Sequence, residues 1–271
     1  MPELPEVETT LRGIQPYLQN QCIKNIIVRD RRLRWPVQAD LDQTMSGALV
    51  KELKRRSKYI FVITSHGSLI IHLGMSGSLR VVDADLQAGK HDHVDLVLSS
   101  GKAVRFHDPR RFGCVLWTDE DLALHPLIKH LGPEPLSSDF DGELLYSRSR
   151  GRQLAVKNFI MDAKVVVGVG NIYASESLFR AGIDPRRSAG KISKKRYIEL
   201  AKKIRETLIR SIELGGTTLR DFVNPEGAPG YFEQTLLVYG RTNQLCQQCD
   251  SAIRQVVLGQ RSSFYCPTCQ R

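Results

Sequence analysis

The first 18 residues carry an amphipathic helical pattern. Their apolar positions recur at intervals of three and four, as on one face of an α-helix: Leu4, Val7, Leu11, Ile14 and Leu18. Pro5 suits the first helical turn, where a missing N–H costs no hydrogen bond. Glu3, Glu6 and Glu8 lie near the positive end of the helix dipole. We therefore predict a helix over residues 2–18 that is held in place by its apolar face.

Short runs rich in Val, Ile and Leu follow between residues 22 and 117, separated by clusters of Gly, Ser, Asp and Pro. The runs occupy residues 59–64, 69–73, 79–82, 94–98, 103–106 and 114–117. Many short strands without intervening helices predict an antiparallel β-sandwich or barrel. Residues 126–138 contain three prolines and a glycine, which indicates a linker and a domain boundary.

The chain becomes helical after this linker. Short helices are predicted over residues 157–162 and 172–180, on either side of a glycine-rich turn at 167–171. A longer helix is predicted to begin after Ser193, a candidate N-cap, and to end at the two glycines at 215–216. The whole pattern is that of an α+β protein with several domains.

Four of the six cysteines lie in the last 26 residues, in the arrangement Cys246-x2-Cys249-x16-Cys266-x2-Cys269. This spacing matches a four-cysteine zinc site, because each pair closes a tight turn that directs two thiolates at one ion. The alternative is two disulfides, which a reducing cytoplasm disfavours. Four protein ligands leave no open position on the metal, so we predict one structural Zn²⁺.

A β-hairpin is predicted between the two cysteine pairs, with strands at residues 252–258 and 262–265 and its tip at 259–261. A rigid hairpin that presents Arg261 is suited to carry positive charge to a phosphate, and the alternative is an exposed arginine without a role. The two remaining cysteines, Cys22 and Cys114, are predicted to be buried thiols.

The composition is that of a folded protein: 271 residues, 41% hydrophobic and 25% charged. No apolar run approaches the ~18 residues that span a bilayer. The acidic N-terminus lacks the apolar core of a signal peptide, so we expect a cytoplasmic protein with no membrane partner. The net charge of +10 is concentrated in residues 148–216, which carry 16 Lys and Arg against 6 Asp and Glu. Such a segment suggests nucleic acid as the partner, and the alternative is a solvated basic face.

The N-terminus offers unusual chemistry. Methionine before proline is normally removed, which leaves Pro2 with a free secondary amine. Such an amine can attack a carbonyl-like carbon and form an iminium ion, which is an electron sink. An α-amine with a pKa of ~7.7–8.0 is roughly 10% free base at neutral pH, against ~0.04% for a lysine. In isolation, however, an ordinary chain terminus is the better interpretation of Pro2.

The order of these features, and several motifs, resemble the formamidopyrimidine-DNA glycosylase / endonuclease VIII family of bacterial base-excision repair. The matching segments are PELPEVET at 2–9, RRSKYI at 55–60, HLGMSG at 72–77, KHDHVD at 90–95, DPRRFG at 108–113, GVGNIYASE at 168–176, GGTTLRDF at 215–222, PGYF at 229–232 and GQRSSFYCPTCQ at 259–270. They span nearly the whole chain. The PELPEVET start and the long loop at 217–232 point to the formamidopyrimidine branch.

This resemblance implies a role for each matching catalytic residue. Pro2 would be the nucleophile at C1′ of the damaged nucleotide, Glu3 the acid that protonates the sugar ring oxygen, and Glu6 a support for that site. Lys58 would contact phosphate and act in β-elimination, and Arg261 would grip phosphate and act in δ-elimination. Cationic groups at these positions would stabilise charge that develops on the leaving phosphates.

The resemblance also implies a set of DNA-contacting residues. Met75, Arg110 and Phe112 match the residues that fill the gap left by an everted base, with Arg110 facing the orphaned cytosine. On their own, Met75 and Phe112 would be read as core residues. The other implied DNA contacts are His91, Arg152, Lys157 and Asn171. The loop at 217–232 matches the segment that covers an everted 8-oxopurine.

The fold implied is an N-terminal helix with an antiparallel β-sandwich (1–131), a helix-two-turn-helix domain with the lesion loop (132–232) and a four-cysteine zinc finger (233–271). The implied function is a bifunctional glycosylase and abasic-site lyase that acts on oxidised purines in duplex DNA, as a monomer associated with the bacterial nucleoid. The alternatives are an endonuclease VIII-like enzyme for oxidised pyrimidines, or a non-catalytic zinc protein that binds DNA. A pure binder would tolerate residues added before Pro2, and the enzyme would not.

Overall fold

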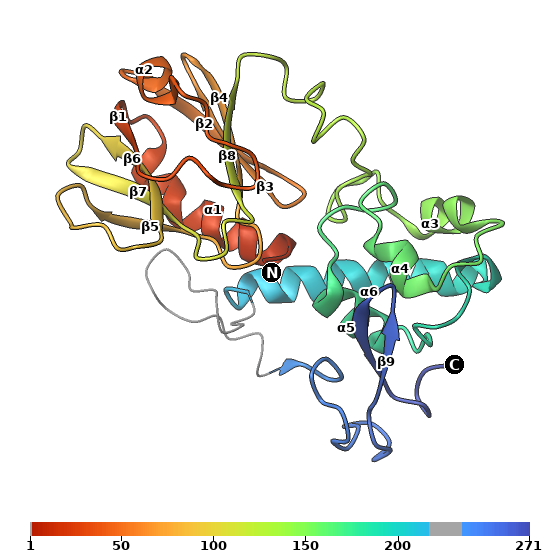
Figure 1. The fold of residues 1–271 in the computed structure, drawn as a ribbon. Coiled ribbons are helices and arrows are strands. Elements are labelled where there is room, and N and C mark those ends of the chain that lie inside the picture. The colour runs from red at the N-terminus through yellow and green to blue at the C-terminus, as the bar shows by residue number, and fades with distance from the viewer. Residues whose placement is uncertain (1, 217–234) are drawn as a thin grey trace. The chain divides into compact units, whose positions relative to one another are not determined.

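A computed structural model describes residues 2–216 and 235–271. These residues form two compact units (Figure 1). The first contains residues 2–129 and 214–216, and the second contains residues 130–213 and 235–271. The predicted lesion loop at 217–232 lies outside the described residues.

The first unit begins with helix α1 (Leu4–Leu18), as the apolar pattern predicted. The five residues of the apolar face are buried, and Ile14 and Leu18 are completely inaccessible to solvent. Pro5 lies in the first turn, and Glu3 is the N-cap residue. A helix that starts three residues from the chain end is thus fixed by burial rather than frayed.

Two four-stranded antiparallel sheets follow α1, which confirms the predicted sandwich. One sheet has the order β1 (Ile23–Val28), β6 (Asp92–Leu98), β7 (Lys102–His107) and β5 (Ser78–Asp83). The other has the order β2 (Val50–Arg56), β3 (Tyr59–Thr64), β4 (Gly67–His72) and β8 (Cys114–Thr118). Alternate residues of both sheets join one core with α1, for example Ile60 and Val62 of β3 and Leu96 of β6. A short helix, α2 (Leu41–Met45), lies between β1 and β2 in the sequence.

The second unit is helical, with α3 (Gly142–Ser149), α4 (Val156–Met161), α5 (Asn171–Arg180), the 3-10 turn η1 (Ala189–Lys191) and α6 (Lys194–Glu213). The α6 helix buries one face that includes Tyr197, Leu200 and Ile204. The Ser193 hydroxyl accepts a hydrogen bond from the Arg196 N–H at 3.4 Å, as expected of an N-cap. The two glycines after α6 have φ of +76° and +84°, which ends the helix in the left-handed region.

The C-terminal hairpin consists of β9 (Arg254–Leu258) and β10 (Arg261–Tyr265). Gly259 and Gln260 form its two-residue turn with φ of +54° and +62°. The prediction placed Arg261 at the tip, but Arg261 pairs with Leu258 and is the first residue of β10. The Arg261 side chain therefore projects from a hydrogen-bonded strand, whose backbone is more restricted than that of a loop.

One cysteine prediction was wrong. Cys114 is buried, and burial raises the pKa of its thiol to about 12. Cys22, in contrast, is exposed. Cys22 lies in an isolated bridge with Leu49 before β1 begins, and its exposed side chain contrasts with that of the next residue, Ile23, which is buried in the core. Among the described residues, no helix is both long and apolar enough to cross a bilayer.

Candidate active site and metal centre

The N-terminal turn of α1 holds three of the predicted catalytic residues. Pro2, Glu3 and Glu6 are buried, and both glutamates are only 3% exposed. Glu3 and Glu6 form a capping box, in which the Glu3 main-chain N–H donates to Glu6 Oε2 at 2.8 Å. The residue after Pro2 is therefore fixed, and a carboxylate directly follows the amine that would be the nucleophile.

The backbone just before the predicted lesion loop also meets this turn. A Cβ added at Gly216 would lie 3.3 Å from both Cγ and Oε1 of Glu6. Gly216 has a φ of +84°, which a side chain would strain in addition. The backbone immediately before residue 217 thus packs on the carboxylate that caps α1.

Lys58 lies in the two-residue turn between β2 and β3, where Arg56 pairs with Tyr59. Ser57, the other turn residue, has a φ of +57°. Arg55 links this turn to α1: its Nη1 donates to Ser57 O at 2.9 Å, and its Nε donates to Glu8 Oε2 at 2.8 Å. Burial acts to raise the pKa of Glu8, but hydrogen bonds from Arg55 and Arg12 outweigh it and lower that pKa. An ionised Glu8 therefore connects α1 to the Lys58 turn.

His72 lies close to Lys58, at the end of β4. Its ring centroid is 4.9 Å from that of Tyr59, which neighbours Lys58 in the sequence. Burial, with the positive charges of Lys58 and Arg34, lowers the pKa of His72 to about 4. His72 is therefore neutral at pH 7, and its Nδ1 accepts the Gly74 N–H at 3.0 Å. A neutral ring therefore adds no further positive charge beside Lys58 and Arg34.

The three predicted gap-filling residues are on two loops of the first unit. Met75 is 37% exposed in the loop between β4 and β5, and Phe112 is 46% exposed in the loop between β7 and β8. The Arg110 guanidinium lies over the Phe112 ring, 4.8 Å from its centroid. The core interpretation of Met75 and Phe112 is therefore wrong, since both large apolar side chains face outward.

His91 precedes β6 in the same unit. Its ring lies edge-on to those of His93 and His107, at centroid distances of 6.3 and 6.0 Å. The His91 side chain is half-buried, so part of its surface is open to a ligand.

In the second unit, Asn171 is the first residue of α5 and is held from two sides. Its Oδ1 accepts from Lys157 Nζ at 2.5 Å, and its Nδ2 donates to Ser262 O at 3.0 Å. Lys157 is completely buried and also donates to Ser262 O and Ser263 Oγ, at 3.0 and 2.7 Å. Lys157 thus joins the start of α5 to β10, directly after Arg261. Its predicted DNA contact stays a prediction, and its burial favours an indirect role through Asn171.

Arg152 and Lys191 are exposed cations beside a surface hollow of about 510 Å³. Gly151, Gln153, Ser188 and Gly190 also line this hollow. The lining is polar and positively charged, which suits an anionic ligand such as a DNA phosphate.

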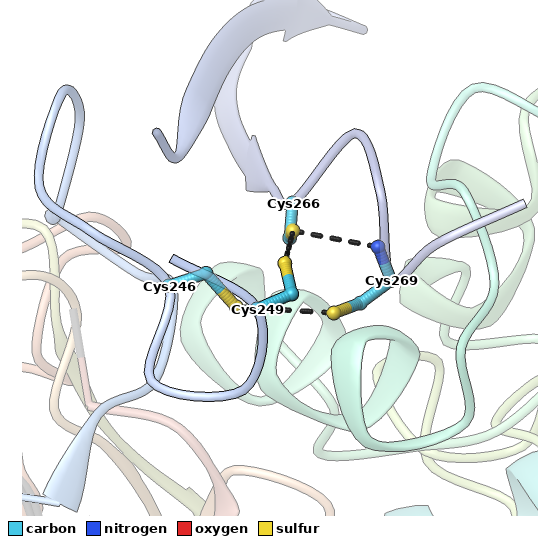
Figure 2. Close-up of side chains that lie close together, drawn as sticks. All are labelled: Cys246, Cys249, Cys266 and Cys269. Carbon is cyan, nitrogen blue, oxygen red and sulfur yellow. Dashed lines mark hydrogen bonds between the residues drawn. The ribbon is translucent and has the colours of Figure 1, made fainter. Parts of the chain in front are cut away.

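The four C-terminal cysteines converge on one point (Figure 2). The Sγ atoms of Cys246 and Cys269 are 3.9 Å apart, those of Cys249 and Cys266 are 3.4 Å apart, and all four lie within 4.8 Å of one another. A tetrahedral site with Zn–S bonds of about 2.3 Å requires sulfur–sulfur distances of about 3.8 Å. The cysteines therefore fit one zinc ion with four thiolate ligands.

Sequence reasoning missed Glu176, which holds the segment that leads into this finger. Glu176 is completely buried in α5, and its carboxylate accepts the main-chain N–H groups of Leu237, Val238 and Tyr239 at 2.9–3.1 Å. A glutamate inside the motif GVGNIYASE reads as a surface residue from its type alone. The sequence feature that could have identified Glu176 is its position in a helix made mostly of apolar and small residues.

Comparison with known proteins agrees with these features. Residues 1–115 match the formamidopyrimidine-DNA glycosylase N-terminal domain, 131–223 the formamidopyrimidine-DNA glycosylase H2TH domain, and 243–271 the zinc finger found in FPG and IleRS. The chain is 60% identical to the formamidopyrimidine-DNA glycosylase of Stutzerimonas stutzeri and 58% identical to that of Pseudomonas aeruginosa, each over 100% of both chains.

Solved structures give the same result. The FPG protein of Thermus thermophilus superposes with a TM-score of 0.88 at 35% identity, covering 99% of this chain and 98% of the other. A Lactococcus lactis FPG variant, solved in complex with DNA that contains Fapy-dG, superposes with a TM-score of 0.92 at 30% identity over 100% of both chains. The resemblance carried by the sequence motifs is confirmed, and the chain belongs to the formamidopyrimidine-DNA glycosylase family.

Proposed function

We propose that Pro2 is the nucleophile of a DNA glycosylase and abasic-site lyase that removes oxidised purines in base-excision repair. The amine of Pro2 attacks C1′ of the damaged nucleotide, a bond forms from nitrogen to C1′, and the bond from C1′ to the base breaks. The observation that carries this assignment is the buried Pro2–Glu3 start, which a capping box with Glu6 holds in place. Complexes of Lactococcus lactis FPG with DNA containing Fapy-dG support an oxidised purine as the substrate.

Glu3, Glu6 and Lys58 serve the proton transfers that accompany attack by Pro2. Glu3 protonates the sugar ring oxygen as the ring opens, and Glu6 fixes the Glu3 backbone through the 2.8 Å hydrogen bond. The iminium acidifies the C2′ proton, whose loss expels the 3′ phosphate. Loss of the C4′ proton from the resulting unsaturated iminium then expels the 5′ phosphate in a second elimination. Lys58 assists the first elimination and Arg261 the second, because each places a cation where negative charge develops.

DNA binding uses groups from both units. Asn171, Arg152 and His91 contact backbone phosphates, and Lys157 supports Asn171 from behind through the 2.5 Å hydrogen bond. Met75, Arg110 and Phe112 fill the gap after base eversion, with Arg110 donating to the orphaned cytosine. When bound, the zinc ion fixes the shape of the hairpin that carries Arg261. The four thiolates fill its coordination sphere, so its role is structural.

We further propose that the chain acts as a monomer on nucleoid DNA in the cytoplasm. The division into residues 1–131, 132–232 and 233–271 is part of this proposal, with the lesion loop at 217–232 in the second domain. The excess of basic residues in 148–216 supports the assignment of duplex DNA as the partner.

A one-residue extension tests the nucleophile. Inserting Gly between Met1 and Pro2 converts the Pro2 amine into an amide nitrogen, so strand cleavage at 8-oxoguanine is expected to fall by about 10³-fold or more. Affinity for the same duplex should change little, because phosphate contacts supply most of it. Cleavage at the wild-type rate by the extended protein, with its N-terminus confirmed by mass, would contradict the proposal.

A further inference from the structure

The two loops that carry the gap-filling residues are joined by a buried aspartate. Asp108 is completely inaccessible to solvent at the start of the β7–β8 loop. One carboxylate oxygen accepts the hydroxyl of Ser76 at 2.9 Å, and the other accepts the main-chain N–H of Gly113 at 2.8 Å. Ser76 directly follows Met75, and Gly113 directly follows Phe112. One carboxylate therefore holds both loops at the residue next to an exposed apolar side chain.

The direction of this carboxylate is fixed by its own backbone. The Asp108 N–H donates to His91 O at 3.0 Å, and the buried His93 places its Nε2 2.8 Å from Asp108 O. Both partners belong to the start of β6 or the residue just before it. The carboxylate thus projects from a segment that the sheet itself holds.

Close backbone packing leaves the two loops little freedom to separate. A Cβ added at Gly74 would lie 2.4 Å from Gly113 N and 2.5 Å from Phe112 C. A Cβ added at Gly113 would lie 2.5 Å from His72 O. The glycines of both loops permit the approach, and the Asp108 hydrogen bonds fasten it.

We propose that Asp108 is a positioning residue for base eversion, which locks Met75, Arg110 and Phe112 into one rigid wedge. This inference rests on the proposed function, since it assumes that these three side chains fill the gap in the duplex. If the two loops moved independently, inserting their side chains into the duplex would cost conformational entropy. A preformed wedge avoids most of that loss. Ser76 is the second component of the lock, because its hydroxyl joins the Met75 loop to the carboxylate.

The test measures the single-turnover rate of 8-oxoguanine excision opposite cytosine. Ser76→Ala removes one link and is expected to lower this rate about 10-fold. Asp108→Ala removes both links and should lower it further. Asp108→Asn should restore the rate to within about 3-fold of wild type, because the Asn amide can accept from Gly113 N–H and donate to Ser76 Oγ. Thr64→Val, which removes a hydroxyl that holds the β3–β4 turn at the other end of β4, is the matched control and should not change the rate.

Two readouts separate a lock from a general loss of stability. Cleavage of an abasic site in single-stranded DNA requires no wedge, so Ser76→Ala should leave that rate within about 2-fold of wild type. In a Met75→Ala/Phe112→Ala background, Ser76→Ala should add less than about 2-fold to the duplex defect, because residues that act as a unit are not additive.

These variants separate a failure of the lock from a failure of the proposed function. A normal duplex rate for Met75→Ala/Phe112→Ala would refute the wedge assignment itself. A slow wedge variant together with a Ser76→Ala rate equal to that of Thr64→Val would refute only the lock. Equal losses by Ser76→Ala on duplex and single-stranded substrates would also refute the lock, since they indicate a defect unrelated to eversion.

Discussion

The two ends of the chain each present a functional group, and they hold it by different means. At the N-terminus, α1 buries Val7, Leu11, Ile14 and Leu18 in the sandwich core, and a capping box fixes the turn behind Pro2. At the C-terminus, β9 and β10 carry Arg261, and much of the hairpin is open to solvent: Val257 is 66% exposed. The apolar cluster beneath it is small and includes two of the metal-binding cysteines, Cys246 and Cys266.

The two ends of the chain are therefore stabilised by different interactions. The position of Pro2 depends on hydrophobic burial shared with the whole first unit, so it cannot be loosened without weakening that unit. The hairpin relies on one metal ion as well as on the Lys157 hydrogen bonds to Ser262 and Ser263, so metal removal is expected to loosen it without weakening the first unit. A change that weakens one arrangement should therefore leave the other intact.

Zinc removal should have the largest effect, and it should be confined to the second arrangement. Structural zinc contributes roughly 10–16 kcal/mol of apparent binding free energy in small fingers. Cys249→Ser, or a chelator, should unfold the hairpin and lower the affinity for damaged duplex by about 10-fold or more, since Arg261 loses its position. Hydrogen exchange should show loss of amide protection in β9 and β10 with α1 unchanged. Unchanged protection of the hairpin in the zinc-free protein would contradict this separation.

A cavity in α1 should have the opposite pattern. Ile14 is completely buried in the sandwich core, so Ile14→Ala should lower the free energy of unfolding of the first unit by about 2–5 kcal/mol. Bound zinc, measured by thiol titration or elemental analysis, should stay at the wild-type level. Denaturant unfolding with both readouts checks this, and loss of zinc in a folded Ile14→Ala protein would show that the two ends are coupled.

The neutral His72 makes the first unit sensitive to acid. The folded pKa of about 4 lies below the ordinary value of 6.5. Between these pH values, His72 is protonated in the unfolded chain and neutral in the folded protein. The stability that is present above pH 6.5 is therefore lost as the pH falls towards 4. The loss amounts to at most about 3 kcal/mol.

Replacing His72 should remove this contribution. The difference in unfolding free energy between wild type and His72→Gln should therefore change over pH 6.5–4. Parallel pH profiles for wild type and His72→Gln would contradict the assignment.

The smallest expected effect concerns a single phosphate contact. Arg152→Ala should reduce the slope of log affinity against log salt by about 1 and weaken binding to damaged and undamaged duplex alike. Lys202→Ala, at another exposed cation, on α6, is the control. A change confined to damaged DNA would indicate that Arg152 reads the lesion rather than the backbone.

The parts of the molecule with a strong local signal could be predicted from the sequence. The 3–4 spacing of apolar residues gave α1, and the cysteine spacing gave the metal site. Strands β1 and β2 and helices α2 and α3 are short and mixed in polarity, so their local patterns do not distinguish them from loops. Their structure depends on tertiary packing that a single sequence does not display.

The supporting residues of the site were the hardest to predict. Lys157 and Glu176 have the residue types of a solvated surface, yet both are completely buried among hydrogen-bond partners. Asp108 was visible in the motif DPRRFG, but its partner Ser76 lies 32 positions away in the sequence. Sequence reasoning finds groups that perform chemistry by their type, and it misses those that hold them because the partners are distant.

On the proposed mechanism, the Pro2 amine forms a covalent bond with the damaged nucleotide. Borohydride reduction during reaction with a duplex that contains 8-oxoguanine opposite cytosine traps such an iminium, and mass analysis of the linked peptide locates it. We predict an adduct on the N-terminal peptide at Pro2. An adduct at Lys58 or another residue, or no adduct from a protein whose N-terminus is verified as free proline, would contradict the claim.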